Sequence, residues 1–396
     1  MMKLKDFIYE LPERLIAQSP AERRTGSRLM VIDREKQQIL HRSFEALKDY
    51  LVCGDCLVFN DTKVMPARLI GKKISTSSDN EPQLDAPAAI EVLLIRKAED
   101  SGTAAAWEAM VRPGKRLKQG ARISFGNGAL EAQITAVLPD GNRLVQFNCR
   151  DEDFPALLSQ IGQVPLPPYI TNKEVDITRY QTVYARNMGS AAAPTAGLHF
   201  SKDYIDILTK MGIKSAYLTL HVGPGTFKPV KTENIEEHHM HREFYHVSEL
   251  AADTINAVKA TRFANQGMTI NQYQMACTVE TANTSEAVNT GGTVNAAASV
   301  RPRVISVGTT SLRTLESVAD KNGFIKPCDG STEIFIYPGY TFRCIDALLT
   351  NFHLPGSTLL MLVSAFAGHE LVMEAYRQAV ANEYRFFSFG DAMLLI

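Results

Sequence analysis

The chain has 396 residues, of which 45% are hydrophobic and 21% are charged, and its formal net charge is −1. These values are typical of a globular protein with one large or two ordinary domains, and they exclude a general attraction to nucleic acid, though not a local basic surface. No apolar run reaches the ~18 residues of a membrane span, and the first residues lack a signal-peptide pattern. The six cysteines are scattered, which argues against a disulfide framework. We therefore expect a cytoplasmic protein without a membrane partner, and we expect a monomer.

Residues 1–62 and 156–396 predict an α/β domain. Strands are expected at Arg28–Asp33, Cys56–Asn60, Ile213–Val222 and Val304–Val307, and helices at Glu13–Gln18, Phe44–Leu51, after the N-cap Ser201, over residues 248–263 and over His369–Asn382. Residues 265–299 are rich in Asn, Thr, Ala and Gly and show no steady period. We expect a long mobile insertion there.

Residues 63–155 have a different character. Short strand-like runs alternate with turn signals such as Arg112-Pro113-Gly114, and this pattern predicts a small β-barrel or sandwich. Ser75–Ala89 within this part is polar and contains proline, so we expect a loop. The expected fold class is therefore α/β, with a larger mixed α/β domain and an inserted small all-β, barrel-like domain.

The stretch Ile334–Gly368 places polar and aromatic groups where strands end and a helix begins. We expect a strand at Ile334–Tyr337, a second apolar segment that ends at Asn351, and a helix after Ser357. Ligand sites of α/β folds lie at such strand ends, which makes this stretch a candidate site wall.

Small and hydroxylated residues follow the expected strand Val304–Val307. Gly308, Thr309, Thr310, Ser311 and Arg313 would open a helix there, and free N–H groups, hydroxyls and an arginine can bind a carboxylate or phosphate. An ordinary capped strand-to-helix turn explains the pattern equally well. It is not a P-loop, because GxxxxGK[ST] is absent.

Histidines occur in several loops. His199 precedes a helix and His221 follows a strand, and either imidazole is a candidate general base, although a lone histidine more often only hydrogen-bonds to its loop. The run His238–His246 suggests a metal site, but adjacent histidines cannot point the same way on a regular element, and HExxH is absent. The single pair Cys53 and Cys56 lacks a second pair for zinc. We favour the interpretation without a metal.

The inserted β domain carries a basic run from Arg112 to Arg122, without an acidic residue. Such a run can follow a phosphate backbone, although a charge run is more often a solvated face. The candidate RNA-binding residues are Lys63, Arg68, Arg112, Lys115, Arg116 and Lys118.

Taken together, the motifs resemble those of the S-adenosylmethionine:tRNA ribosyltransferase-isomerase family of queuosine biosynthesis. They cover nearly the whole chain in order: FIYELPERLIAQSPAERRTGSRLMVID, VFNDTKVMPARLIG, APTAGLHF, TLHVGPGTFKPV, EEHHMHREF, VGTTSLRTLES, IFIYPGYTFRCIDALLTNFHLPGSTLLMLVSAFAG and YRFFSFGDAMLLI. The sequence departs from the family pattern at Met188, where a proline is usual, and at Pro224, where a small residue is usual. Neither departure removes a candidate catalytic group.

The resemblance implies a reaction. The ribosyl part of S-adenosylmethionine is transferred to an aminomethyl-deazaguanine at the tRNA wobble position and is rearranged, which gives epoxyqueuosine in tRNA and releases adenine and methionine. The co-substrate is a ribosyl donor here, and no metal is implied. The sulfonium acidifies the neighbouring ribose proton, so an imidazole or a carboxylate can act as base.

The candidate residues for this chemistry come from the motif match. The acid and base candidates are His199, His221 and His353, followed by His241 and Glu243. The substrate-binding candidates are Gly308, Thr309, Thr310, Ser311 and Arg313 for the methionine carboxylate, and Tyr337, Tyr340, Asn351 and Phe352 for a flipped base. Two other interpretations stay open: a metal-dependent hydrolase that uses His238–His246, and an RNA-binding protein without catalysis.

Overall fold

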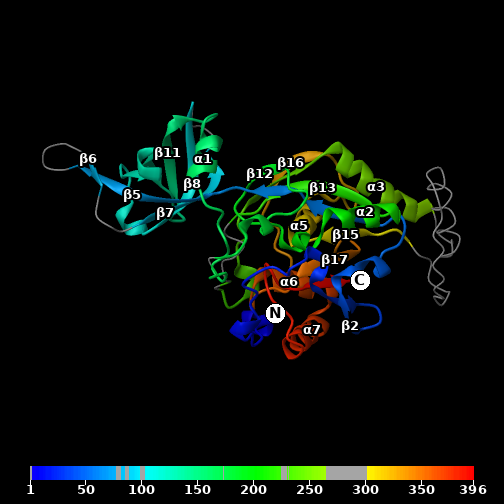
Figure 1. Ribbon diagram of the computed structural model, residues 1–396. Helices are drawn as coiled ribbons and strands as arrows, with labels where there is room; N and C mark the ends of the chain where they lie inside the picture. The colour runs from blue at the N-terminus through cyan, green and yellow to red at the C-terminus, as the bar shows by residue number, and fades with distance from the viewer. Residues whose placement is uncertain are drawn as a thin grey trace.

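The computed structural model describes residues 2–76, 82–84, 89–98, 103–172, 174–223, 230, 232–264 and 301–396. A β-rich lobe stands to one side of a larger α/β body, and both chain termini belong to the body (Figure 1). The predicted insertion 265–299 and Pro224 lie outside the described residues.

The body is built on a mixed sheet. Its nine strands among the described residues follow the order β16 (Cys328–Thr332), β14 (Glu243–Val247), β13 (Lys214–His221), β3 (Cys56–Asn60), β15 (Val304–Val307), β17 (Ala347–Asn351), β18 (Ala392–Leu395), β1 (Arg28–Asp33) and β2 (Gln38–Ser43). The four central strands β13, β3, β15 and β17 are parallel. Their carboxyl ends therefore share one edge, which is where an α/β sheet places its ligands.

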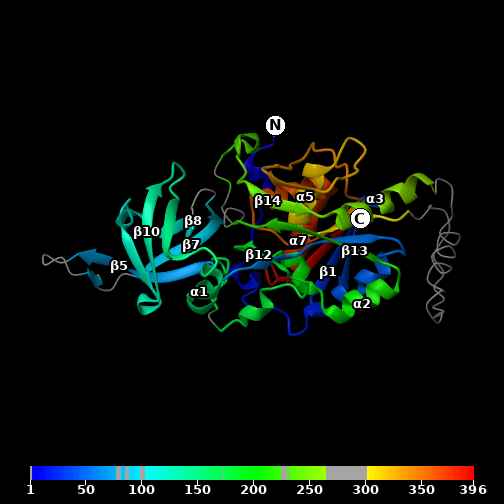
Figure 2. The same ribbon diagram turned by 90° about the horizontal axis from the view of Figure 1, so that it is seen from above.

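Helices cover both faces of this sheet. One face packs on α3 (Glu249–Ala264), α5 (Thr309–Val318), α6 (Thr358–Ala367) and α7 (His369–Ala381). The other packs on α2 (Lys202–Lys210) and the 3-10 helices η4 (Phe44–Tyr50) and η8 (Thr195–His199). Figure 2 shows α2 opposite α3 and α5. Alternate strand residues serve the two faces, as with Val58 on the first and Phe59 on the second, because successive side chains of a strand point to opposite sides.

The inserted lobe is a closed antiparallel barrel. Six of the described strands form it: β5 (Arg68–Thr76), β7 (Ile90–Lys97), β8 (Ala104–Arg112), β11 (Arg143–Arg150), β10 (Leu130–Val137) and β9 (Arg122–Phe125), which pairs back to β5. Helix α1 (Phe154–Ile161) packs its Phe154 into the barrel core. Gly71 on β5 permits the closure, because a Cβ there would lie 2.6 Å from the carbonyl oxygen of Ser124. The predicted fold class is confirmed.

The chain enters and leaves the barrel at one place. Arg68 and Gln163 exchange two backbone hydrogen bonds of 3.0 and 2.8 Å. Beside them, β4 (Thr62–Val64) pairs in parallel with β12 (Asn187–Ser190).

Several predicted elements match the structure, and others do not. The strand predicted at Ile334–Tyr337 is wrong: the segment is irregular, and its apolar side chains pack on the core instead of pairing with a strand. Within the loop predicted at Ser75–Ala89, residues Pro82–Leu84 form strand β6 against β5. The helix predicted at Phe44–Leu51 is the 3-10 helix η4, and only the 3-10 turn η2 (Glu13–Leu15) forms near Glu13–Gln18. By contrast, the Ser201 Oγ caps α2 by accepting the Tyr204 N–H at 3.1 Å, as expected.

Among the described helices, none is by itself long and apolar enough to cross a membrane. The helices α6 and α7 meet that criterion only as a pair, and they are bent by 117° at the break between them.

Candidate active site at the carboxyl edge of the sheet

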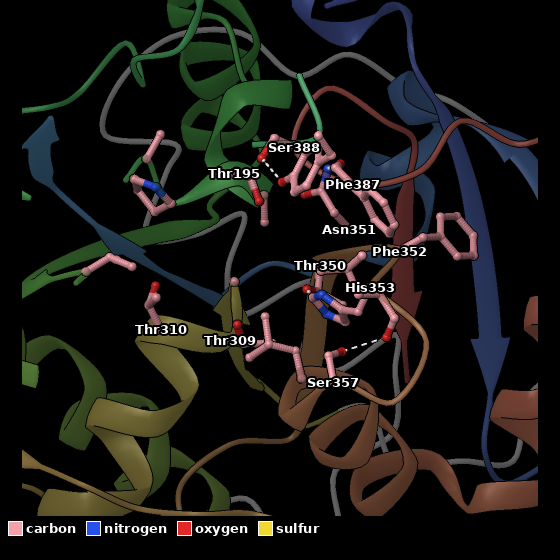
Figure 3. A pocket seen from close by; sticks show the side chains of 18 residues that line it. Thr195, Thr309, Thr310, Thr350, Asn351, Phe352, His353, Ser357, Phe387 and Ser388 are labelled. Carbon is pink, nitrogen blue, oxygen red and sulfur yellow. Dashed lines mark hydrogen bonds between the residues drawn. The ribbon is translucent and has the colours of Figure 1, made fainter. Parts of the chain in front are cut away.

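A cavity lies at the carboxyl edge of the parallel strands. It is enclosed by the ends of β15 and β17, the start of α5, η8 and the segment Phe387–Ser388 (Figure 3). Its polar lining consists of Tyr169, Thr195, Thr309, Thr310, Thr350, Asn351, His353, Ser357 and Ser388. No Asp, Glu, Lys or Arg is among these described lining residues. The cavity is thus suited to a neutral ligand part that makes directional hydrogen bonds.

The N-terminus of α5 points its first turn at this cavity. Gly308 is the N-cap with φ 89°, a conformation that glycine adopts without strain, and no side chain among the described residues caps the helix. Gly308, Thr309 and Thr310 all line the cavity. Because the first N–H groups of a helix lack intrahelical partners and sit at the positive end of its dipole, this corner favours an anionic group.

Ser311 and Arg313 of the same helix are not among the lining residues of the cavity. The Ser311 Oγ donates to the Val307 carbonyl at 3.1 Å. Arg313 and Glu243 form an ion pair in which both residues are buried, with 2% and 3% of their surfaces exposed. This ion pair connects α5 to β14, and a buried cation needs such a partner.

Asn351 and His353 line the opposite side of the cavity. The Asn351 Nδ2 donates to the Phe387 carbonyl at 2.9 Å, and the Asn351 side chain also contacts His199. The His353 Nε2 lies 3.1 Å from the Thr350 Oγ1, and its backbone N–H donates to the Tyr376 hydroxyl at 2.9 Å. Burial lowers the pKa of His353 to about 3, so its imidazole is neutral near pH 7.

His199 lies behind the cavity wall, on η8. Its Nδ1 is 2.7 Å from the Ser27 Oγ, and its ring stacks on Phe44 with centroids 5.0 Å apart. Burial lowers the pKa of His199 to about 4, although Asp391 and a contact with Asn351 oppose that shift. His199 is thus a neutral group that supports the wall beside Asn351.

His221 lies at the end of the neighbouring strand β13, and it is not among the lining residues. Its Nδ1 is 2.9 Å from the Thr62 Oγ1. The ring packs on the backbone of Gly189, where a Cβ would lie 2.7 Å from the imidazole Cε1. Burial lowers the pKa of His221 and the nearby Asp61 carboxylate opposes the shift. Asp61 is itself held by the Thr219 hydroxyl at 2.7 Å.

Of the predicted aromatic residues, Phe352 belongs to the cavity lining, and Tyr337 and Tyr340 do not. Phe352 is 1% exposed and packs on Tyr376, Tyr384 and Phe386, and Figure 3 shows its ring directed away from the cavity. Tyr337 packs against the core, and the Tyr340 hydroxyl donates to Glu316 at 3.3 Å. His241 is exposed, just before β14.

Sequence reasoning missed several lining residues. The Tyr169 hydroxyl and the Ser388 Oγ are 2.7 Å apart across 219 residues of chain, and both line the cavity with Thr195 and Thr350. Thr195 and Ser388 stand inside the quoted motifs APTAGLHF and YRFFSFGDAMLLI, which was the available signal.

The basic candidates lie on or beside the barrel. Arg68 pairs with Glu91 at 2.9 Å. The other five are exposed and take part in no ion pair recorded for the described residues: Lys63, Arg112, Lys115, Arg116 and Lys118. Within the same part of the chain, no group of three His, Cys, Asp or Glu residues is placed to hold a metal ion.

This architecture is that of an α/β protein with a candidate ligand site at the carboxyl edge of its sheet. A family model described as "Queuosine biosynthesis protein" matches residues 4–272 and 265–395. The chain is 48% identical to the S-adenosylmethionine:tRNA ribosyltransferase-isomerase of Acetivibrio thermocellus and 49% identical to that of Caldanaerobacter subterraneus, with 100% of each chain covered.

A solved structure also matches. The crystal structure of an S-adenosylmethionine tRNA ribosyltransferase from Thermotoga maritima aligns with 34% identity and a TM-score of 0.47, over 99% of this chain and 100% of that one. On the family model and the full-length relatives, the chain belongs to the S-adenosylmethionine:tRNA ribosyltransferase-isomerase family.

Proposed function

We propose that this protein transfers and isomerises the ribosyl group of S-adenosylmethionine onto the aminomethyl-deazaguanine of a tRNA wobble position. The products are epoxyqueuosine-tRNA, adenine and methionine. Full-length family membership carries this proposal, and the cavity at the carboxyl edge of the sheet supports it.

We place the methionine part of the co-substrate at the N-terminus of α5. Its carboxylate would accept from the free N–H groups that follow Gly308, as anions do at helix N-termini. The uncharged lining would then contact the neutral adenosyl part. The amide of Asn351 lines this part of the cavity and can hydrogen-bond to the ligand.

Position and pKa favour different histidines as the general base. His353 is best placed, because it lines the cavity, but a pKa of about 3 makes it a weak base near neutral pH. His221 is less buried and has Asp61 nearby to stabilise its protonated form. We therefore propose His221 as the base, with His353 as a neutral hydrogen-bonding group.

The exposed cations beside and on the barrel are the proposed contacts to the tRNA backbone. Among the residues that the structure describes, no ion pair neutralises the charges of Lys63, Arg112, Lys115, Arg116 and Lys118. Phosphate contacts of this kind position an RNA and make its binding depend on salt.

The test is adenine release from S-adenosylmethionine in the presence of an anticodon stem-loop that carries the aminomethyl-deazaguanine. The wild type should release adenine and methionine only with that RNA. Folded protein that releases neither would sink the proposal. Activity that a chelator abolishes would instead favour the metal-dependent hydrolase.

A pair of variants separates the histidines. Gly189→Ala should displace the His221 ring, because the new Cβ overlaps it, and should lower kcat about as much as His221→Gln does. In the His353→Gln variant, the profile of kcat against pH should keep its acidic limb, because that limb reports the protonation of the proposed base, His221. If His353→Gln removes that limb and Gly189→Ala does not change it, the roles are reversed.

A further inference from the structure

A second cleft lies between the barrel and the α/β body. It encloses about 530 Å³, within the ~300–1,000 Å³ range of ligand sites. One wall is the outward face of β7 and β8, and the other is the segment Pro165–Pro168 together with Ile170 and Ala191.

The barrel wall combines an aliphatic surface with a cation, Arg112. Leu93 of β7 lies opposite Met110 of β8, and Glu91 lies opposite Arg112. Arg68 neutralises Glu91 through an ion pair of 2.9 Å. Arg112 is exposed and takes part in no ion pair recorded for the described residues. The wall therefore presents apolar side chains beside an arginine.

The cleft is the direct neighbour of the first cavity. Tyr169 lines the first cavity and Ile170 lines the cleft. In the same way, Ala193 lines the first cavity and Ala191 the cleft. Two short segments of chain thus form the partition between both spaces, and ligand groups on its two sides would be close neighbours.

We infer that this cleft holds an unpaired nucleotide of the RNA, adjacent in sequence to the base that enters the first cavity. A splayed nucleotide has an apolar face and an anionic phosphate, and the Leu93–Met110 surface with Arg112 matches both. The exposed Lys115 and Arg116 follow directly after β8 and extend the positive charge at this end of the barrel. The inference rests on the proposed function for the identity of the RNA.

The test measures binding of the modified anticodon stem-loop by fluorescence anisotropy, without S-adenosylmethionine. Single abasic replacements are placed at each loop nucleotide beside the modified base. In the wild type, one such replacement should weaken binding about tenfold, as expected for the loss of one buried apolar contact. The Met110→Ser variant should bind the intact loop about as weakly as the wild type binds the abasic loop. The abasic replacement should then cause no further loss of affinity in this variant.

The barrel offers a matched control. Arg150→Gln changes an exposed arginine of β11 that pairs with Glu152 at 2.6 Å and does not line the cleft. Arg112→Gln should reduce the salt dependence of binding, and Arg150→Gln should not. Met110 is only partly buried, so its replacement should leave the unfolding temperature near that of the wild type.

Two results would overturn the inference: an abasic penalty in Met110→Ser equal to that of the wild type, or no sensitive loop position in the wild type. Because binding is measured without the co-substrate, it is independent of turnover. Absence of adenine release alongside the expected binding pattern would sink the proposed reaction and leave the cleft as an RNA site.

Discussion

The α/β body and the barrel handle charge in opposite ways. In the body, Arg313 is buried and paired with Glu243, and the cavity lining contains only uncharged groups and helix ends. On the barrel, Arg112 and its basic neighbours are exposed and lack recorded ion pairs. Two arginines that looked alike as candidate ligand-binding residues thus differ in burial and in partner.

This difference indicates a division of labour. A small co-substrate is best oriented by fixed, desolvated hydrogen-bonding groups, because they need not reorganise when it binds. A polyanion is best captured by exposed cations, whose attraction acts over about a Debye length and is screened by salt. Variants on each side should therefore fail in different measurements.

The largest expected effect follows from disruption of the buried ion pair in the α/β body. Arg313→Met should lower the free energy of unfolding by about 3–5 kcal/mol, because Glu243 then stays buried without its cation. Urea denaturation measures this loss. The double variant Arg313→Met/Glu243→Leu should recover most of it, since an apolar pair has no charge to desolvate. Wild-type stability with a raised KM for S-adenosylmethionine would show instead that Arg313 binds the ligand.

The second-largest effect should follow the removal of a side chain that lines the cavity. Asn351→Ala should reduce kcat/KM for S-adenosylmethionine roughly tenfold to hundredfold, which corresponds to a lost hydrogen bond in a buried site. Its affinity for the stem-loop should change little. Steady-state kinetics with each substrate varied in turn gives both numbers. An equal loss in RNA affinity would contradict the separation of the two regions.

The pH dependence of stability tests the neutral histidines. His199 and His353 have pKa values of about 4 and about 3 in the fold, against ~6.5 in the unfolded chain. Below pH ~6.5 the unfolded chain binds more protons, so the free energy of unfolding should fall as the pH drops toward 4, by up to ~1.4 kcal/mol per pH unit and histidine.

His353→Gln should make this slope shallower. The stability that the neutral His353 contributes is fully present above pH ~6.5 and is lost as the pH falls toward 3. Urea titrations between pH 4.5 and 7 would be compared for variant and wild type, at about half-unit steps. An unchanged slope would mean that His353 titrates normally in the fold.

The smallest effect belongs to single exposed cations. Lys115→Gln should leave kcat unchanged and reduce the slope of log binding constant against log salt by about 0.7–0.9, the amount for one phosphate contact. Stem-loop binding between roughly 50 and 200 mM salt measures it. Lys97→Gln, which removes a lysine paired with Asp151, is the matched control. A slope equal to that of the wild type would exclude Lys115 from the RNA contact.

The sequence predicted the regular core of the fold better than its site. The bounds of β1, β3 and β15 agree with prediction because each is a buried apolar run between turn signals. Ile334–Tyr337 has the same composition, but its residues pack on the core without a partner strand. Apolar composition reports burial, and strand pairing depends on distant segments that a local pattern does not contain.

The same limit explains which residues of the candidate site could be predicted from the sequence. Gly308, Thr309 and Thr310 were found because a strand, a glycine and a helix start adjoin in sequence, and they line the cavity. Arg313 was chosen by the same local rule, while its partner Glu243 comes from a distant strand. Tyr169 and Ser388 meet only through the fold, so local spacing gave no reason to pair them.

The backbone pair between Arg68 and Gln163 gives the barrel an unusual independence from the body. Paired residues of neighbouring antiparallel strands have Cα atoms about 5 Å apart, a gap that a two-residue hairpin turn spans. We therefore expect that a short turn can replace the whole barrel without changing the order of strands in the larger sheet. The same junction is therefore where an engineered substitute for the barrel should be inserted.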